Sequence, residues 1–184
     1  GKMWAFEHFD VVPDVVTFGK GLSAGMAITG AVTTKAIAEQ SRGKAGVPWA
    51  GTYSGDPLPA AVALKQLQIV LRDDLTTRAA TLGKRLGERL ADLAQRFDFI
   101  GEARGLGLYQ MLDIVTDRES RTPDFDTAER IRYNAVHEGL VLLTSRNCIR
   151  LCPPLTITDD ELDEALGRLT AAFVRTEQGE PKGL

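Results

Sequence analysis

The sequence predicts a mixed α/β chain: the end of a large α/β domain, a long connecting helix, and a small α+β domain at the C-terminus. Three observations support this fold class. A β-branched run at 15–18 precedes a glycine-flanked lysine, a leucine stripe with spacings of three and four covers 75–97, and a helix-capping sequence stands at 158–161. We place the three parts at 1–72, 73–97 and 98–184.

The first part is expected to contain two strands and a short helix. Pro13 and Asp14 precede the apolar run Val15–Phe18, which is typical of a strand. A second strand is expected at 27–32. Thr33 or Thr34 is a suitable N-cap for a short helix at 36–38.

Glycine and proline residues then predict a loop over 41–52. Asp56 is followed by proline, the usual order of an N-cap and the first helical position, so a helix should run from there to about residue 72. The leucine stripe that follows predicts a long amphipathic helix with one apolar side.

The C-terminal part should alternate strands and helices. We expect, in order, a strand at 106–115, a polar loop at 116–123, a helix from 126 that ends at Gly139, a strand at 140–143, and a final helix that Thr158 and Glu161 cap. Arg150 is expected on a further short strand, with Ile149 and Leu151 on the opposite face. A frayed tail is expected from residue 176.

Composition excludes several classes of protein. The net charge of −3 gives no basis for binding nucleic acid or an anionic membrane, and no apolar stretch in the 184 residues is long enough to cross a bilayer. With no signal peptide visible, we expect a cytoplasmic protein. The two cysteines, Cys148 and Cys152, suit reduced thiols better than a disulfide or metal site, and the two histidines form no triad or zinc cluster.

Lys20 is the first candidate for chemistry. It follows an apolar strand and lies between Gly19 and Gly21, where a ligand can approach closely. If apolar neighbours bury the amine, its pKa falls and the neutral form can attack an aldehyde to give a Schiff base. The alternative is an ordinary surface lysine in a turn.

Five segments in order resemble the second half of class III, fold type I, pyridoxal-phosphate (PLP) aminotransferases. They are GKMWAFEHF, PDVVTFGKGLSAG, GTYSGDPLPAA, EARGLGL and IRLCPPLTIT, and the resemblance covers Gly1 to about Phe173. It implies PLP as cofactor and a PLP-transferase large domain with a mostly parallel sheet. It also leads us to expect that the chain is the C-terminal half of a longer polypeptide, without the acid for the pyridine nitrogen and the ring-stacking aromatic residue.

The resemblance assigns roles to three residues. Lys20 matches the catalytic lysine that binds the cofactor covalently and then moves the substrate proton. Thr52 matches a threonine that reaches the cofactor phosphate of the neighbouring subunit, which implies a homodimer with shared active sites, or a tetramer. Arg150 matches the arginine that binds the substrate α-carboxylate. The alternatives are a loop threonine that satisfies its own backbone and an arginine in a structural ion pair.

Asp56 departs from the commoner class III pattern, which has asparagine there. The text GDPLPAA is similar to that of dialkylglycine decarboxylases, in which the matching aspartate and threonine help to bind an alkali-metal ion. Thr52 and Asp56 are therefore candidate metal ligands, with simple helix capping as the alternative for Asp56. Arg104 also matches a family motif, for which a role in supporting the fold is expected.

The resemblance implies a PLP-dependent aminotransferase that moves an amino group from an amino acid or ω-amino acid to a 2-oxo acid. One alternative is a decarboxylating transaminase of the dialkylglycine decarboxylase type. Another, of a different class, is a non-catalytic PLP-fold scaffold, which should lack Lys20 or Arg150.

Overall fold

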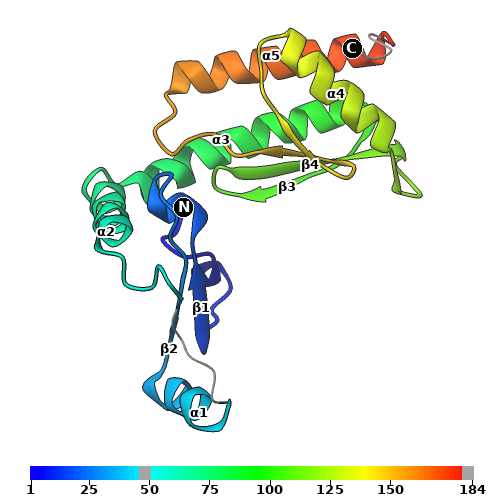
Figure 1. Ribbon diagram of the computed structural model, residues 1–184. Helices are drawn as coiled ribbons and strands as arrows, with labels where there is room; N and C mark the ends of the chain where they lie inside the picture. The colour runs from blue at the N-terminus through cyan, green and yellow to red at the C-terminus, as the bar shows by residue number, and fades with distance from the viewer. Residues whose placement is uncertain (46–50, 180–184) are drawn as a thin grey trace. The chain divides into compact units, whose positions relative to one another are not determined.

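The computed structural model describes residues 1–45 and 51–179, which form two compact units (Figure 1). The first unit is 2–74 and the second is 75–184, with Gly1 grouped with the second. The long helix α3 (Leu75–Arg96) belongs to the second unit. The finer division at 72 and 97 stays a prediction.

The first unit contains a two-stranded antiparallel sheet and four short or medium helices. Its elements are η1 (Ala5–His8), β1 (Val15–Phe18), η2 (Lys20–Ser23), β2 (Gly30–Thr33), α1 (Lys35–Ala45) and α2 (Pro57–Arg72). The mixed α/β class is confirmed. The two strands pair antiparallel, and the parallel sheet expected of the large domain is not formed by strands of the described residues.

Two boundaries in this unit differ from the expectation. The second strand begins at Gly30, not at 27, because the register pairs Gly30 with Phe18. The Phe18 ring lies directly over Gly30, where an added Cβ would be only 2.3 Å from it. The expected loop at 41–52 was wrong for residues 41–45, which continue α1, and residues 46–50 lie outside the described part of the chain.

Helix α2 begins as the sequence predicts. Asp56 is its N-cap, and the Oδ1 atom of Asp56 accepts a hydrogen bond from the Leu58 backbone N–H at 3.0 Å. Pro57 occupies the first helical position, where its missing N–H is harmless. The helix ends at Arg72, also as expected.

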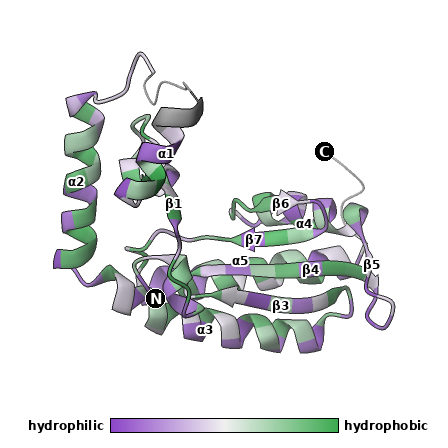
Figure 2. Ribbon diagram, turned by 90° about the horizontal axis from the view of Figure 1, so that it is seen from below, coloured by the Kyte–Doolittle hydropathy of each residue, from purple (hydrophilic) through white to green (hydrophobic). Residues whose placement is uncertain are grey.

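The second unit is an antiparallel sheet with three helices over one face. The main strand order is β3 (Ile100–Leu106), β4 (Tyr109–Asp117), β7 (Cys148–Leu151) and β6 (Leu143–Ser145), and the short β5 (Thr122–Pro123) also pairs with β4. Helices α3, α4 (Phe125–His137) and α5 (Asp159–Glu177) lie on one side of it (Figure 1). The opposite face of the sheet is the one nearer the viewer in Figure 2.

The hydrophobic core lies between this sheet and its helices. Leu86 and Leu90 from α3 meet Leu112 from β4, with an aromatic group of Phe97, Phe99 and Phe173 at one end. The leucine stripe predicted on the long helix is therefore the core-facing side of α3.

A pair of glycines allows α3 to approach the β3–β4 hairpin closely. A Cβ added to Gly83 would lie 2.2 Å from the carbonyl carbon of Gly107, well inside contact distance. Gly107 itself has φ of +54° in the hairpin turn. This contact needs glycine on the helix because there is no room for a side chain.

Several element boundaries in this unit were wrong. The strand expected at 106–115 corresponds to β4, which begins only at Tyr109 because Gly107 turns the chain before it, and β3 was not predicted. The expected loop at 116–123 includes the end of β4 and all of β5. The strand expected at 140–143 begins only at Leu143.

The two later helices agree better with the sequence. Helix α4 ends at His137, and Gly139 has φ of +75° just beyond it, as a left-handed cap requires. The capping box of Thr158 and Glu161 is present at the start of α5. The expected fraying from 176 was wrong for Thr176, which is buried and accepts a hydrogen bond from Asn134 at 2.8 Å, and residues 180–184 lie outside the described part of the chain.

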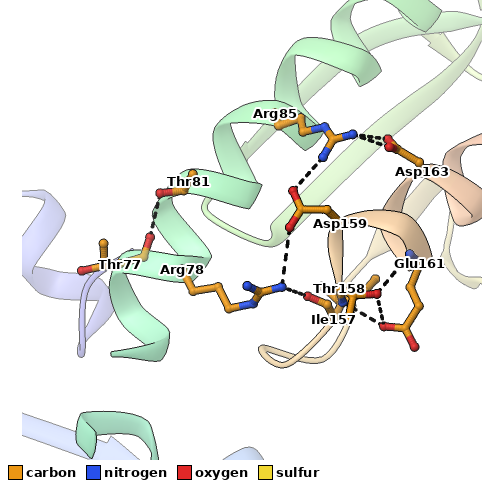
Figure 3. Close-up of polar contacts among 9 residues, drawn as sticks. All are labelled: Thr77, Arg78, Thr81, Arg85, Ile157, Thr158, Asp159, Glu161 and Asp163. Carbon is orange, nitrogen blue, oxygen red and sulfur yellow. Dashed lines mark hydrogen bonds and ion pairs between the residues drawn. The ribbon is translucent and has the colours of Figure 1, made fainter. Parts of the chain in front are cut away.

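Two arginines of α3 bind the start of α5 (Figure 3). Arg78 donates to the Ile157 carbonyl, and Arg85 donates to Asp159 at 2.8 Å and also to Asp163. These contacts fix the chain that leaves β7 for α5.

No helix in the described ranges combines the length and the apolar character needed to cross a bilayer.

Candidate functional site

Lys20 follows β1 after Gly19 and begins the 3₁₀ turn η2. Its backbone is left-handed, with φ of +49°. The expected burial was wrong for the described residues: the side chains of β1 alternate between exposed and half-buried, and Lys20 is exposed. The reason is that β1 is paired only with β2 here, so no further layer of the described chain covers the hairpin.

Hydrogen bonds close the turn that carries Lys20. The Leu22 N–H donates to the Gly19 carbonyl at 3.2 Å, and the Met26 N–H donates to the Ser23 carbonyl at 2.9 Å. The Ser23 hydroxyl, which is buried, donates to the Lys20 carbonyl at 2.9 Å. Sequence reasoning missed Ser23, although a serine three residues after the lysine is spaced to reach its carbonyl.

An open hollow of about 480 Å³ adjoins this turn, lined by Lys20, Ser23 and residues 25–29. A Cβ added to Gly21 would meet no atom within 4 Å in the described part of the chain. The surroundings of the lysine therefore leave space for a ligand of moderate size.

Thr52 lies in a tight turn just before α2, and it is exposed. The turn's backbone is satisfied by Ser54, whose N–H donates to the Gly51 carbonyl at 2.9 Å and whose Oγ accepts from the Gly51 N–H at 2.7 Å. Within the described residues the Thr52 hydroxyl makes no hydrogen bond. The alternative of a loop threonine that satisfies its own backbone therefore finds no support in the described residues, and a role of Thr52 at a phosphate stays a prediction.

Asp56 is exposed and its Oδ1 caps α2. The capping interpretation is confirmed, and an additional role as an ion ligand stays a prediction. Residues 1–45 and 51–179 contain no group of three or more His, Cys, Asp or Glu side chains placed to hold a metal ion.

Arg150 lies on β7, half-buried, opposite Met111 of β4 and Leu143 of β6. Ile149 next to it is fully buried in the core. The Arg150 guanidinium forms no hydrogen bond or ion pair with any side chain that the structure describes. The alternative of a structural ion pair therefore finds no partner in the described residues.

Arg104 differs from Arg150 in this respect. It donates three hydrogen bonds to Asp113 across the β3–β4 pair, the shortest at 2.8 Å, and this carboxylate raises the pKa of the guanidinium. The geometry agrees with the expected role in supporting the fold.

Both cysteines are free thiols, as predicted. The Cys148 thiol donates to Asp113 at 2.8 Å, and partial burial raises its pKa. Burial also raises the pKa of Cys152, while the nearby charge of Arg150 opposes that shift. Sequence reasoning missed Asp113; its signal was the polar residue alternating with apolar Leu112 and Ile114 along β4.

Lys20, Thr52 and Asp56 thus belong to the first unit, and Arg150 belongs to the second. The first three have accessible polar groups before or after short turns, and the fourth is an arginine without a carboxylate neighbour in the described chain.

Comparison with known proteins gives consistent matches. The family model for class-III aminotransferases matches residues 1–173. The chain is 39% identical to a probable 4-aminobutyrate aminotransferase of Bacillus subtilis and 36% identical to a leucine/methionine racemase of Thermococcus litoralis. These matches cover 94% and 97% of this chain and 40% of each relative.

Solved structures agree. An amine transaminase from an uncultivated Pseudomonas species, determined in its PLP-bound form, matches with a TM-score of 0.87 and 36% identity, over 95% of this chain and 41% of that one. An (S)-enantioselective omega-transaminase from Thermomicrobium roseum matches with a TM-score of 0.82 and 32% identity, over 93% of this chain and 39% of that one.

The chain spans about 40% of the length of the curated relatives it matches. Because the family model covers nearly the whole of this sequence, the chain belongs to the class-III aminotransferase family.

Proposed function

We propose that this protein is a PLP-dependent aminotransferase that moves an amino group from an amino acid or ω-amino acid to a 2-oxo acid. The observation that carries the proposal is Lys20, an exposed lysine in a strained glycine-flanked turn beside an open hollow, within a segment that resembles the one that carries the family's catalytic lysine. Backbone strain of this kind tends to persist at functional sites.

The described residues fit the cofactor. The Lys20 amine is accessible, the space beside Gly21 is open, and the hollow is large enough for a pyridine ring. Thr52 offers an uncommitted hydroxyl for a phosphate. When bound, the cofactor supplies an aldehyde for the amine and an electron-withdrawing ring that acidifies the substrate carbon.

In this proposal the Lys20 Nζ atom has two tasks. It would hold the cofactor covalently, and as a free amine the same atom would accept and return the substrate's proton. A base tethered to the turn gains from proximity, because it needs no encounter with solvent base.

Arg150 binds the substrate carboxylate in the same proposal. A guanidinium that is not paired with a protein carboxylate can give two parallel hydrogen bonds to a carboxylate ligand. Its place on a strand paired on both sides gives it a rigid base.

The proposal also includes a homodimer, or a tetramer built from it, in which Thr52 serves the neighbouring subunit's cofactor. A cytoplasmic location is part of it too, supported by the two free thiols. Diluting the protein to monomer should release PLP, and Thr52→Ala should weaken PLP retention. A stable monomer with full occupancy would rule this arrangement out.

The central test uses the full-length protein with PLP. Borohydride reduction followed by peptide mapping should place the cofactor on Lys20, and Lys20→Ala should abolish both the visible absorbance and the fixed cofactor. Lys35 and Lys65 serve as internal controls, since both are exposed in the same unit. Cofactor fixed to either of them would overturn the assignment.

Racemization is a second candidate, because relatives at 34% and 36% identity carry the names isoleucine 2-epimerase and leucine/methionine racemase. An L-amino acid incubated without a 2-oxo acid should keep its configuration if the protein is an aminotransferase, and should become a mixture of enantiomers if it is a racemase.

The decarboxylating alternative has a separate assay. 2-Aminoisobutyrate has no α-hydrogen, so its consumption with pyruvate must release carbon dioxide. We expect none, because helix capping already accounts for Asp56, the residue that suggested this activity. A non-catalytic scaffold is disfavoured, since Lys20 and Arg150 are both present.

A further inference from the structure

Ser23 is unusual among the polar residues of the first unit. It is only 3% exposed, in a unit where most side chains are exposed or half-buried. A hydroxyl is buried at little cost only when it is hydrogen-bonded. The bond that Ser23 makes is the one to the Lys20 carbonyl, at 2.9 Å.

The residue that accepts this bond has a strained backbone. Lys20 has φ of +49°, a left-handed conformation that costs a residue with a side chain on the order of 1 kcal/mol. Ala24 is left-handed as well, with φ of +47°. Such conformations persist only where surrounding contacts hold them.

The conformation matters because it sets the direction of the lysine side chain. Rotating φ of Lys20 to the right-handed region would swing its Cα–Cβ bond and displace the amine at the end of the chain. Ser23 lines the same hollow as Lys20, so its hydroxyl bond fixes the turn at the edge where a ligand would lie.

We propose that Ser23 is a positioning residue: its buried hydroxyl holds Lys20 in the left-handed conformation and so keeps the amine directed at the hollow. This inference rests on the proposed function of Lys20. It assigns no contact between Ser23 and the cofactor or substrate.

The test compares four variants of the full-length protein with the wild type. The measured quantity is the rate at which Lys20 captures added PLP, obtained by borohydride reduction at timed intervals and peptide mapping. Ser23→Ala should slow capture about tenfold, the typical effect of losing one hydrogen bond to a buried group. Ser23→Thr keeps the hydroxyl and should recover to within about threefold.

Thr33→Val is the matched control. It also removes a bond from a hydroxyl to a backbone carbonyl, that of Thr33 to Asp14 at 2.8 Å, but Thr33 pairs with Val15, at the opposite end of β1 from Lys20. Its capture rate should equal that of the wild type. If threonine does not fit the buried site, Ser23→Cys, a weaker donor, should fall between wild type and Ser23→Ala.

A second measurement separates positioning from folding. Acetylation rates of Lys20, Lys35 and Lys65 report the reactivity of each amine without any cofactor. Positioning predicts a change at Lys20 alone in Ser23→Ala, whereas a general loss of structure changes all three and would overturn the inference. Unchanged rates of PLP capture and of acetylation in Ser23→Ala would overturn the inference too. If PLP is fixed to a lysine other than Lys20 in the wild-type protein, the proposed function is overturned instead.

Discussion

The two units of the chain differ in how much hydrophobic core each one contains. The second unit has a continuous hydrophobic core between its sheet and three helices, with Leu90, Phe97 and Phe173 fully buried. Among its described residues the first unit buries few side chains, and large apolar residues such as Val32 and Leu64 are 61% and 58% exposed. The unit that carries Lys20 is thus the one with less core of its own.

This difference separates two ways of presenting a reactive group. Arg150 lies on a strand between two others above a packed core, so its position follows from the fold of the second unit. Lys20 lies in a turn that, within the described residues, is closed by a few local hydrogen bonds, so the described contacts that position it are local ones. Mutations in the core of the second unit should therefore mainly lower its stability, whereas mutations near Lys20 in the first unit should mainly change the reactivity of the lysine.

The largest effect is expected from Phe173→Ala. Phe173 is fully buried and contacts Phe97 and Phe99 at ring distances of 5.3 and 5.6 Å, so truncation leaves a cavity in the core. The second unit should lose about 3–5 kcal/mol of stability. Amide hydrogen exchange of α3, α5 and β4 in the full-length protein would measure it.

Leu64→Ala is the control for this comparison. Leu64 is largely exposed on α2, so within the described residues its truncation removes little packing and should change stability by less than about 0.5 kcal/mol. Equal losses for the two variants would show that the first unit is packed as tightly in the full-length protein as the second.

The next effect is on substrate binding. Arg150→Leu removes the guanidinium proposed to bind a carboxylate, a pair worth about 2–4 kcal/mol, so kcat/KM for an amino acid should fall by roughly 30- to 1,000-fold. Most of this fall should come from a higher KM, and the absorbance of the bound cofactor should be unchanged. Arg150→Lys keeps the charge but cannot give two parallel hydrogen bonds. Its kcat/KM should therefore lie between those of the wild type and Arg150→Leu.

A simple amine without a carboxylate is the decisive control substrate. Its turnover should change little in Arg150→Leu. Equal losses for the amine and the amino acid would contradict the carboxylate role and point to damage in the second unit.

The sequence predicted well what depends on local chemistry. The Asp56 cap, the capping box at Thr158, the left-handed Gly139 and the apolar side of α3 are readable because neighbouring residues determine them. The strand predicted at 106–115 matches β4, but β3 and the turn between them were missed, since glycine at 105 and 107 does not say which one turns the chain.

What the sequence could not show was long-range or conformational. The bond between Asn134 and Thr176 joins residues 42 positions apart, and nothing local announces it. The exposure of Lys20 depends on which layers cover β1, which strand periodicity alone does not determine. The left-handed φ of Lys20 was hidden as well, because a lysine between two glycines gives no reason to expect the strain on the lysine itself.

A smaller effect is expected at the cap of α2. Asp56→Ala removes the bond to the Leu58 N–H and should cost about 1 kcal/mol, seen as faster amide exchange in the first turns of α2. Asp56→Asn should retain most of the cap, because asparagine is an equally good N-cap. If Asp56 also binds an alkali-metal ion, Asp56→Asn should remove any difference in activity between sodium and potassium, and a cap alone predicts no such change.

The smallest effect concerns pH and the surface of the second unit. Hydrogen bonds from Arg132 and Thr144 hold the pKa of Glu129 below its usual value, and the bond from Thr144 joins α4 to β6. Because the folded state lowers this pKa, the stabilisation is present above the ordinary pKa of glutamate, near 4.5, and is lost as the pH falls through the folded value. Glu129→Gln should therefore destabilise the unit at pH 7, and the difference between the two proteins should be smaller at pH 3. The side chain is 45% exposed, so the gap at pH 7 should be no more than about 0.5 kcal/mol and should shrink further in high salt. Denaturation midpoints of both proteins at the two pH values would measure it, and a gap that widened on acidification would show that Glu129 is not held as the carboxylate.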